Sequence, residues 1–124
     1  MNLLLIFAGG GAGAVARYLM MTAVGRFIGT EFPWHTLSVN VLGAVFIGAL
    51  TEFMALRVSA IEPMRFLLVT GFLGGFTTFS TFSLETAMMW EKGDYTQAAL
   101  YAAASVIGTV IAVFGGTAAA RLFL

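Results

Sequence analysis

One stretch near the middle of the chain combines residue types that could bind or pass a small solute. It runs from Thr70 to Ser83 and reads T-G-F-L-G-G-F-T-T-F-S-T-F-S. Residues 76–83 alone hold three phenylalanines and five Thr or Ser hydroxyls, and they include no aliphatic side chain. Hydroxyl groups donate hydrogen bonds, and an aromatic ring presents a positive edge. This composition predicts a polar path rather than a packing surface whose hydroxyls bond back to their own helix.

The glycine pair Gly74–Gly75 lies at the centre of this stretch. Each glycine lowers helix stability by about 1 kcal/mol relative to alanine. A continuous helix over 63–90 would be about 40 Å long, whereas the hydrocarbon core of a bilayer is about 30 Å thick. We therefore expect the helix to break at Gly74 and Gly75. Backbone carbonyls that are freed at such a break are candidate ligands for a cation.

The overall composition indicates an integral membrane protein. The chain has 124 residues, of which 60% are hydrophobic and only 10% are charged, whereas about 25% are charged in a typical soluble domain. This length leaves room for four spans of roughly 20 residues each. The N-terminus lacks the basic region and the cleavage site of a signal peptide, so we expect the first span to be retained. The predicted architecture is one all-α membrane domain over 1–124, with spans at 3–25, 34–56, 63–90 and 95–121.

Several function classes are disfavoured by the sequence. The formal net charge is zero, which argues against a nucleic-acid partner. The chain has no cysteine, and no nucleophile–base pair, carboxylate pair or metal cluster is visible, so we do not expect an enzyme. The pattern Gly9-x-Gly11-x-x-Ala14 imitates a dinucleotide-binding fingerprint, but the strand that must precede one is missing. Gly9 and Gly13 instead favour close helix packing.

Four polar side chains lie inside the predicted spans or at their edges. Arg17 either extends to the interface or attracts an anion, because ionisable residues inside a membrane are functional candidates. Asn40 must find a hydrogen-bond partner in hydrocarbon, and the small residues near it favour a polar track over a purely structural bond. Glu85 is either protonated or paired. His35 is expected in the interfacial belt rather than at a metal, because zinc sites need at least three protein ligands.

The fourth span carries two stripes in which residues recur at every fourth position. One stripe contains only small residues: Ala104, Gly108, Ala112, Gly116 and Ala120. The other contains polar residues: Gln97, Tyr101, Ser105 and Thr109. The small stripe predicts a close contact with another helix, and the polar stripe could line a path.

The basic residues in the loops do not favour one orientation in the membrane. Arg57, Arg65 and Arg121 fall on one side of a four-span arrangement, and Arg26 and Lys92 fall on the other. Such a small bias gives almost no positive-inside signal. We therefore expect the chain to insert in both orientations and to pair with itself in an antiparallel dimer.

The stretch from Gly71 to Ser83 resembles the signature of the Fluc (CrcB) fluoride channels. The similarity extends along the whole chain, with a G-G-x-x-A-R-Y-like start at 10–18, T-L-x-V-N at 36–40, and Glu85 after the phenylalanine motif. The resemblance implies a fluoride-selective channel that exports fluoride passively from the cytoplasm. It also implies a dual-topology antiparallel homodimer, with two pores at the protomer interface, in a bacterial or archaeal plasma membrane.

The resemblance suggests roles for individual residues. Phe79 and Phe82 are expected to line the pores, Asn40 corresponds to the pore asparagine, and Arg17 corresponds to an arginine of the vestibule. The remaining residues expected to line the pore carry hydroxyl groups and come from the phenylalanine stretch and the fourth span: Thr78, Ser80, Thr81, Tyr101, Ser105 and Thr109.

The resemblance also implies a structural sodium ion at the centre of the dimer. The backbone carbonyls of Gly74 and Thr77 are the expected ligands. Carbonyl oxygens suit a hard cation, as they do in channel filters. Glu85 is expected to have a gating or polar role near the pore.

Two other functions compete with a fluoride channel. A small proton-coupled multidrug exporter is also four-span and dual-topology, but it needs a membrane-embedded carboxylate in its first span. This chain has Arg17 there and no acid, so only Glu85 could serve. A non-transporting packing subunit would explain the small-residue stripes, but it would leave the phenylalanine–hydroxyl stretch without a purpose.

Overall fold

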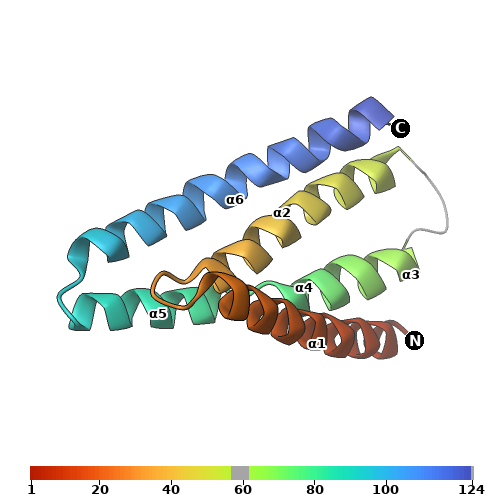
Figure 1. The fold of residues 1–124 in the computed structure, drawn as a ribbon. Coiled ribbons are helices and arrows are strands. Elements are labelled where there is room, and N and C mark those ends of the chain that lie inside the picture. The colour runs from red at the N-terminus through yellow and green to blue at the C-terminus, as the bar shows by residue number, and fades with distance from the viewer. Residues whose placement is uncertain (57–61, 124) are drawn as a thin grey trace.

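The computed structural model describes residues 1–56 and 62–123 of the chain (Figure 1). The helices in these ranges are α1 Asn2–Ile28, α2 Trp34–Ala55, α3 Glu62–Met64, η1 Arg65–Leu73, α4 Gly74–Phe76, α5 Phe79–Glu91 and α6 Tyr95–Phe123. η1 is π-helical, a form in which hydrogen bonds join residues five apart. No strand occurs in the described ranges, which confirms the all-α prediction.

Four helical stretches among the described residues are long and apolar enough to cross a membrane. They are Asn2–Ile28, Trp34–Ala55, Glu62–Glu91 and Tyr95–Phe123. The third stretch combines α3, η1, α4 and α5. This finding confirms the expectation of four potential spans, whereas the assignment of the whole chain to one domain stays a prediction.

The helices pack as two close pairs, and the two pairs also contact each other. α2 lies beside α6, and α1 lies along η1 and α4 (Figure 1). α1 also contacts α2, and α5 contacts α6. The turn between α5 and α6 contains Gly93, whose φ of 83° favours glycine. Both termini lie at the same end of the bundle in Figure 1.

Glycines allow α1 to approach η1 at backbone distance. A Cβ atom at Gly9 would collide with the carbonyl oxygen of Leu67, and a Cβ atom at Gly13 would collide with that of Phe72. Both glycines are buried. The prediction that Gly9 and Gly13 form a helix-packing pair is therefore confirmed.

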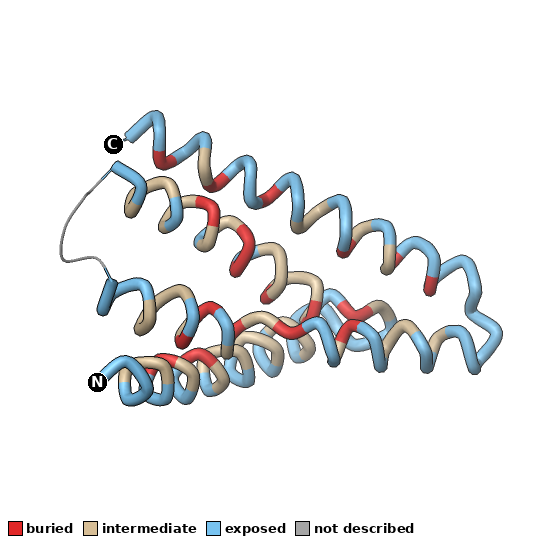
Figure 2. The backbone as a smooth tube through the Cα atoms, turned by 180° about the vertical axis from the view of Figure 1, so that it is seen from behind, coloured by how far each residue is buried: buried red, intermediate tan, exposed pale blue. Residues whose placement is uncertain are grey.

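A second glycine contact joins α2 to α6. A Cβ atom at Gly48 would collide with the carbonyl oxygen of Val113, and one at Gly116 would collide with that of Val45. Buried positions recur along the side of α6 that faces α2 (Figure 2). Within the predicted small-residue stripe, the buried members are Ala112, Gly116 and Ala120. Ala104 and Gly108 are half-buried, so the close contact is concentrated in the C-terminal part of α6.

The prediction that the third span breaks at the glycine pair is wrong in position. Gly74 is helical, with φ −61° and ψ −38°, and α4 continues through Gly75. The extended residues are Thr77, with ψ 158°, and Thr78, with φ −151°. A Cβ atom at Gly75 would collide with the carbonyl oxygen of Gly10. Gly75 therefore serves the contact with α1, and the helical backbone is interrupted after it.

Several charged residues lie next to the second loop. Glu62 and Arg65 are exposed, and Arg57 lies outside the described residues. Glu52 differs, because its Oε1 atom accepts a hydrogen bond from Nε of Arg121 at 2.9 Å. This ion pair joins the ends of α2 and α6.

The glycine contact between α2 and α6 predicts the effect of one substitution. Gly116→Leu should lower the thermal unfolding midpoint of the detergent-solubilised protein, because a side chain there displaces the backbone of α2. Overpacking of this kind costs about 1–3 kcal/mol or more. The matched control is Gly115→Leu, because a Cβ atom at Gly115 has no neighbour within 4 Å among the described residues. Equal midpoints for the two variants would contradict the contact.

Candidate functional site

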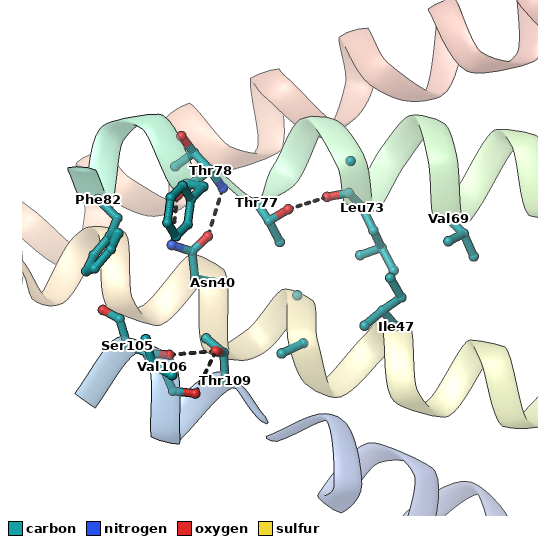
Figure 3. Close-up of a pocket in the computed structure, with 14 residues that line it drawn as sticks. Asn40, Ile47, Val69, Leu73, Thr77, Thr78, Phe82, Ser105, Val106 and Thr109 are labelled. Atoms are coloured by element: carbon teal, nitrogen blue, oxygen red, sulfur yellow. Dashed lines mark hydrogen bonds between the residues drawn. The ribbon is translucent and has the colours of Figure 1, made fainter. Parts of the chain in front are cut away.

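A cavity of about 350 Å³ lies between α2, α6 and the segment around Thr77 and Thr78 (Figure 3). The predicted pore residues that line it are Asn40, Thr78, Phe79, Phe82, Ser105 and Thr109. The residues predicted to bind sodium, Gly74 and Thr77, also line it. The remaining wall is formed by apolar or small residues: Gly43, Ala44, Ile47, Val69, Leu73 and Val106. The cavity is therefore largely apolar, with polar groups from three parts of the chain.

Asn40 stabilises the interrupted backbone through two hydrogen bonds. Its Nδ2 atom donates to the carbonyl oxygen of Thr78 at 2.9 Å, and its Oδ1 atom accepts from the Thr78 N–H at 2.8 Å. An extended residue loses its helical partners, and unpaired backbone groups are costly at membrane depth. The Asn40 carboxamide supplies both missing partners (Figure 3). Asn40 thus makes an interhelical bond and also lines the cavity.

The Thr78 hydroxyl is the centre of a small group of hydroxyls at the start of α5. It accepts from the backbone N–H of Thr81 at 3.2 Å, so Thr78 caps α5. It donates to Oγ1 of Thr81 at 3.1 Å and lies 3.3 Å from Oγ of Ser80. A Thr cap of this kind stabilises a helix start by about 1 kcal/mol. Ser80 and Thr81, both predicted to line the pore, lie outside the cavity lining and contact Thr78 instead.

The hydroxyls contributed by α6 differ in their bonding. Thr109 donates to the carbonyl oxygen of Ser105 in its own helix at 2.6 Å. The Oγ atom of Ser105 is buried, and within the described part of the chain no protein group bonds to it. Both residues line the cavity. Ser105 therefore offers a hydroxyl that is available to a solute.

The two predicted pore phenylalanines have different environments. Phe82 is only 8% exposed, whereas Phe79 is 76% exposed. Their ring centroids are 5.3 Å apart, and both rings contribute to the cavity wall. Phe82 also packs against Tyr101, at a centroid distance of 5.1 Å. One ring is thus fixed within the chain, and the other lies on its surface.

Glu85 is paired on both of its oxygens. Nε2 of His35 lies 2.9 Å from Oε2, and the Tyr101 hydroxyl donates to Oε1 at 2.8 Å. The sequence analysis expected Glu85 to be either protonated or paired, and the structure gives it two partners, His35 and Tyr101. Tyr101 was predicted to line the pore, but it lies behind Phe82 rather than in the cavity lining.

The contact between His35 and Glu85 was missed by the sequence analysis, which placed His35 in the interfacial belt. The available signal was that an acid inside a span requires a partner, and the chain has one histidine. The described residues include no group of three or more His, Cys, Asp or Glu that could hold a metal.

Arg17 contacts the interrupted segment directly. Its Nη1 atom donates to the carbonyl oxygen of Thr77 at 3.3 Å. This contact places a half-buried positive charge beside the interruption. It also occupies one acceptor position of a carbonyl that was predicted to bind sodium.

Besides the carbonyl of Thr77, the interruption frees the carbonyl of Gly74. In a continuous helix the Thr78 N–H would bond to the carbonyl of Gly74, four residues earlier. Because that N–H bonds to Asn40 instead, the Gly74 carbonyl loses its helical donor. The carbonyl oxygens of Thr77 and Gly74 are hard ligands of the kind that suits a sodium ion. The positive charge of Arg17 nearby would repel such an ion.

The sequence matches the family described as "CrcB-like protein, Camphor Resistance (CrcB)" over residues 4–117. The fluoride-specific ion channel FluC of Chelativorans sp. (strain BNC1) is 48% identical over 123 residues, which cover 99% of this chain and 98% of that protein. FluC of Caulobacter sp. (strain K31) is 50% identical over 121 residues, with coverages of 97% and 94%. FluC of Agrobacterium fabrum (strain C58 / ATCC 33970) is 46% identical over 120 residues, with coverages of 97% and 96%. The chain therefore belongs to the CrcB-like protein family.

Proposed function

We propose that this chain forms a fluoride-selective ion channel that exports fluoride passively across a bacterial plasma membrane. The observation that carries the proposal is the similarity to curated proteins named fluoride-specific ion channels, which are 48% and 46% identical over nearly the whole chain. Four apolar helices of membrane-spanning length in the described ranges agree with a multi-pass location. The alternative, a multidrug exporter that uses Glu85, finds no support in these relatives.

The cavity contains groups that suit a small anion. Fluoride is strongly hydrated, so a narrow path must replace its water with other donors. The Ser105 hydroxyl has no partner among the described residues, and the Asn40 amide nitrogen carries a second N–H besides the one donated to Thr78. The rings of Phe79 and Phe82 add positive edges. Arg17 supplies a positive charge near the interrupted segment, which favours entry of an anion.

The functional unit in this proposal is an antiparallel homodimer with two pores at the interface between its protomers. The Phe79 ring is 76% exposed although it borders the cavity, so a second copy could complete the wall there. The nearly balanced basic residues of the loops are compatible with insertion in both orientations.

A structural sodium ion at the centre of this dimer is a further part of the proposal. The Gly74 and Thr77 carbonyls of two copies would together offer four oxygen atoms. Such an ion would stabilise the interrupted backbone, because it would offset the repulsion between the carbonyl oxygen atoms around it.

Purified protein in liposomes should release trapped fluoride rapidly while it retains chloride. The physical reason is that a path lined by few donors and by aromatic edges selects a small anion. A fluoride electrode and a chloride electrode measure the two rates on the same preparation. Chloride release at a rate similar to that of fluoride, or no fluoride release from folded protein, would contradict the proposed selectivity.

Removal of the unpartnered hydroxyl should reduce fluoride flux without loss of stability. A hydrogen bond to a charged group contributes about 1.5–3 kcal/mol, so Ser105→Ala should lower the flux roughly 10- to 150-fold. The unfolding midpoint should stay the same or rise, since the Oγ atom makes no hydrogen bond within the described structure.

The matched control is Ser83→Ala, because the Ser83 hydroxyl is exposed and donates to the Phe79 carbonyl of its own helix. This variant should conduct like the unmodified protein. If Ser105→Ala also retained full flux, Ser105 would not be a donor to fluoride.

Sodium should raise the thermal stability of the solubilised protein. A ligand present at about 100 times its dissociation constant adds about 2.7 kcal/mol to folded-state stability. The measurement compares unfolding midpoints in sodium and in a large organic cation at equal ionic strength. Identical midpoints in the two salts would show that the Gly74 and Thr77 carbonyls hold no sodium ion.

A further inference from the structure

A line of aromatic rings connects the loop before α2 to the cavity wall. It begins at Trp34, whose ring centroid lies 4.7 Å from that of Phe32. The Phe32 ring meets Tyr101 edge-on at a centroid distance of 5.5 Å, and Tyr101 packs on Phe82 at 5.1 Å. Phe82 lies 5.3 Å from Phe79, and both rings line the cavity. The loop, α6 and α5 are thus joined by ring contacts that end at the proposed path.

A hydrogen-bonded turn fixes Phe32 relative to α2. The turn is centred on Pro33, whose φ of −78° and ψ of 60° are close to those of an inverse γ-turn. The Trp34 N–H donates to the Phe32 carbonyl at 2.8 Å, which is the hydrogen bond of such a turn. The Leu37 N–H donates to the Pro33 carbonyl at 3.1 Å and connects the turn to the start of α2. Because proline also restricts its own φ, the Phe32 ring is presented by a stiff segment.

Tyr101 is the residue through which Phe32 can influence the cavity. Tyr101 is fully buried, and its hydroxyl is held by Glu85 at 2.8 Å. With the hydroxyl fixed, the ring can still turn about its long axis, and the rings of Phe32 and Phe82 limit that motion. Protein interiors are closely packed, so neighbouring side chains shift toward a space that a truncation leaves. A smaller residue at position 32 would therefore loosen Tyr101 and, with it, Phe82.

The position of the Phe82 ring affects the width of the proposed path. Phe82 is only 8% exposed, and it lines the cavity together with Asn40 and Ser105 (Figure 3). Chloride is larger than fluoride and gains less from each donor, because the attraction falls as the distance between charges grows. Movement of the ring away from the path would consequently favour chloride more than fluoride.

We propose that Phe32 is a positioning residue for anion selectivity: it supports Tyr101 and thereby holds Phe82 where the path excludes anions larger than fluoride. This inference rests on the proposed function. Phe32 is half-buried and does not belong to the cavity lining, so it acts through the two rings that follow it. The loop before α2 thus takes part in selectivity although it lies outside the path.

The test is the ratio of fluoride to chloride efflux from liposomes that contain the purified full-length Phe32→Ala protein. A smaller amount of folded protein lowers both rates in proportion, so a purely structural role leaves the ratio unchanged. The variant should lower the ratio about tenfold or more, which corresponds to about 1.4 kcal/mol in the difference between the two barriers. An unchanged ratio would overturn this inference alone. Unmodified protein without selective fluoride release would overturn the proposed function and this inference with it.

Further variants at the same position separate the ring contact from the rest of the side chain. Phe32→Tyr keeps the ring and should keep the selectivity of the unmodified protein. Phe32→Leu fills part of the space without a ring, and it carries the same test if the alanine variant does not fold. The matched control is Phe27→Ala, because Phe27 is 85% exposed near the end of α1. A loss of selectivity in Phe27→Ala as large as that in Phe32→Ala would contradict the assignment.

A double variant tests the route through Tyr101. If Phe32 acts through this ring, the effects of the two substitutions are not additive. Phe32→Ala/Tyr101→Leu should therefore have the same fluoride-to-chloride ratio as Tyr101→Leu alone. A further tenfold fall in the double variant would show that Phe32 acts by another route and would overturn the inference.

Discussion

The reciprocal pair of hydrogen bonds between Asn40 and Thr78 is the interaction on which the rest of the site depends. Thr78 adopts an extended backbone in a stretch that must lie inside an apolar bundle. Without the Asn40 carboxamide, its N–H and C=O groups would have no partner there, at a cost of several kcal/mol each. The same bonds release the Gly74 carbonyl and set the direction in which α5 begins. The position of Phe82 therefore follows from one side chain on α2.

Close helix contacts surround the bonds between Asn40 and Thr78, and a Cβ atom at Gly43, one turn after Asn40, would collide with Cγ2 of Thr77. Gly9 and Gly13 bring α1 into backbone contact with η1, and Gly48 and Gly116 do the same for α2 and α6. Larger residues at these positions would separate the helices. Apolar helices in lipid gain little from hydrophobic burial, so such packing contacts provide much of the association energy. The glycines thus position the polar groups without taking part in their chemistry.

The sequence predicts the helices better than it predicts the contacts between them. Hydropathy and length are local properties, and they identify the four potential spans; the Gly9 and Gly13 spacing identifies a close contact. The position of the interruption is not a local property. The low helix propensity of glycine, about 1 kcal/mol relative to alanine, favours a break of the helix at Gly74. The hydrogen bonds that Thr78 makes as the cap of α5 and with Asn40, which is 38 residues away, place the interruption later in the chain. The contact of His35 with Glu85 joins residues 50 apart, and no periodicity reports it.

The bonding of individual hydroxyls separates structural from solute-facing groups. Ser83 and Thr86 donate to carbonyls one turn earlier in α5, which is the usual way for a helix in lipid to satisfy a hydroxyl. Ser105 has the same option in α6 but does not use it, and its Oγ atom lies buried at the cavity. An unpaired hydroxyl at this depth is a cost that a purely structural position would avoid through an alanine, as at Ala112 or Ala120 in the same helix. The cost is offset if a solute accepts the hydrogen bond, and an anion is the solute that gains most from a donor in a place where water is scarce.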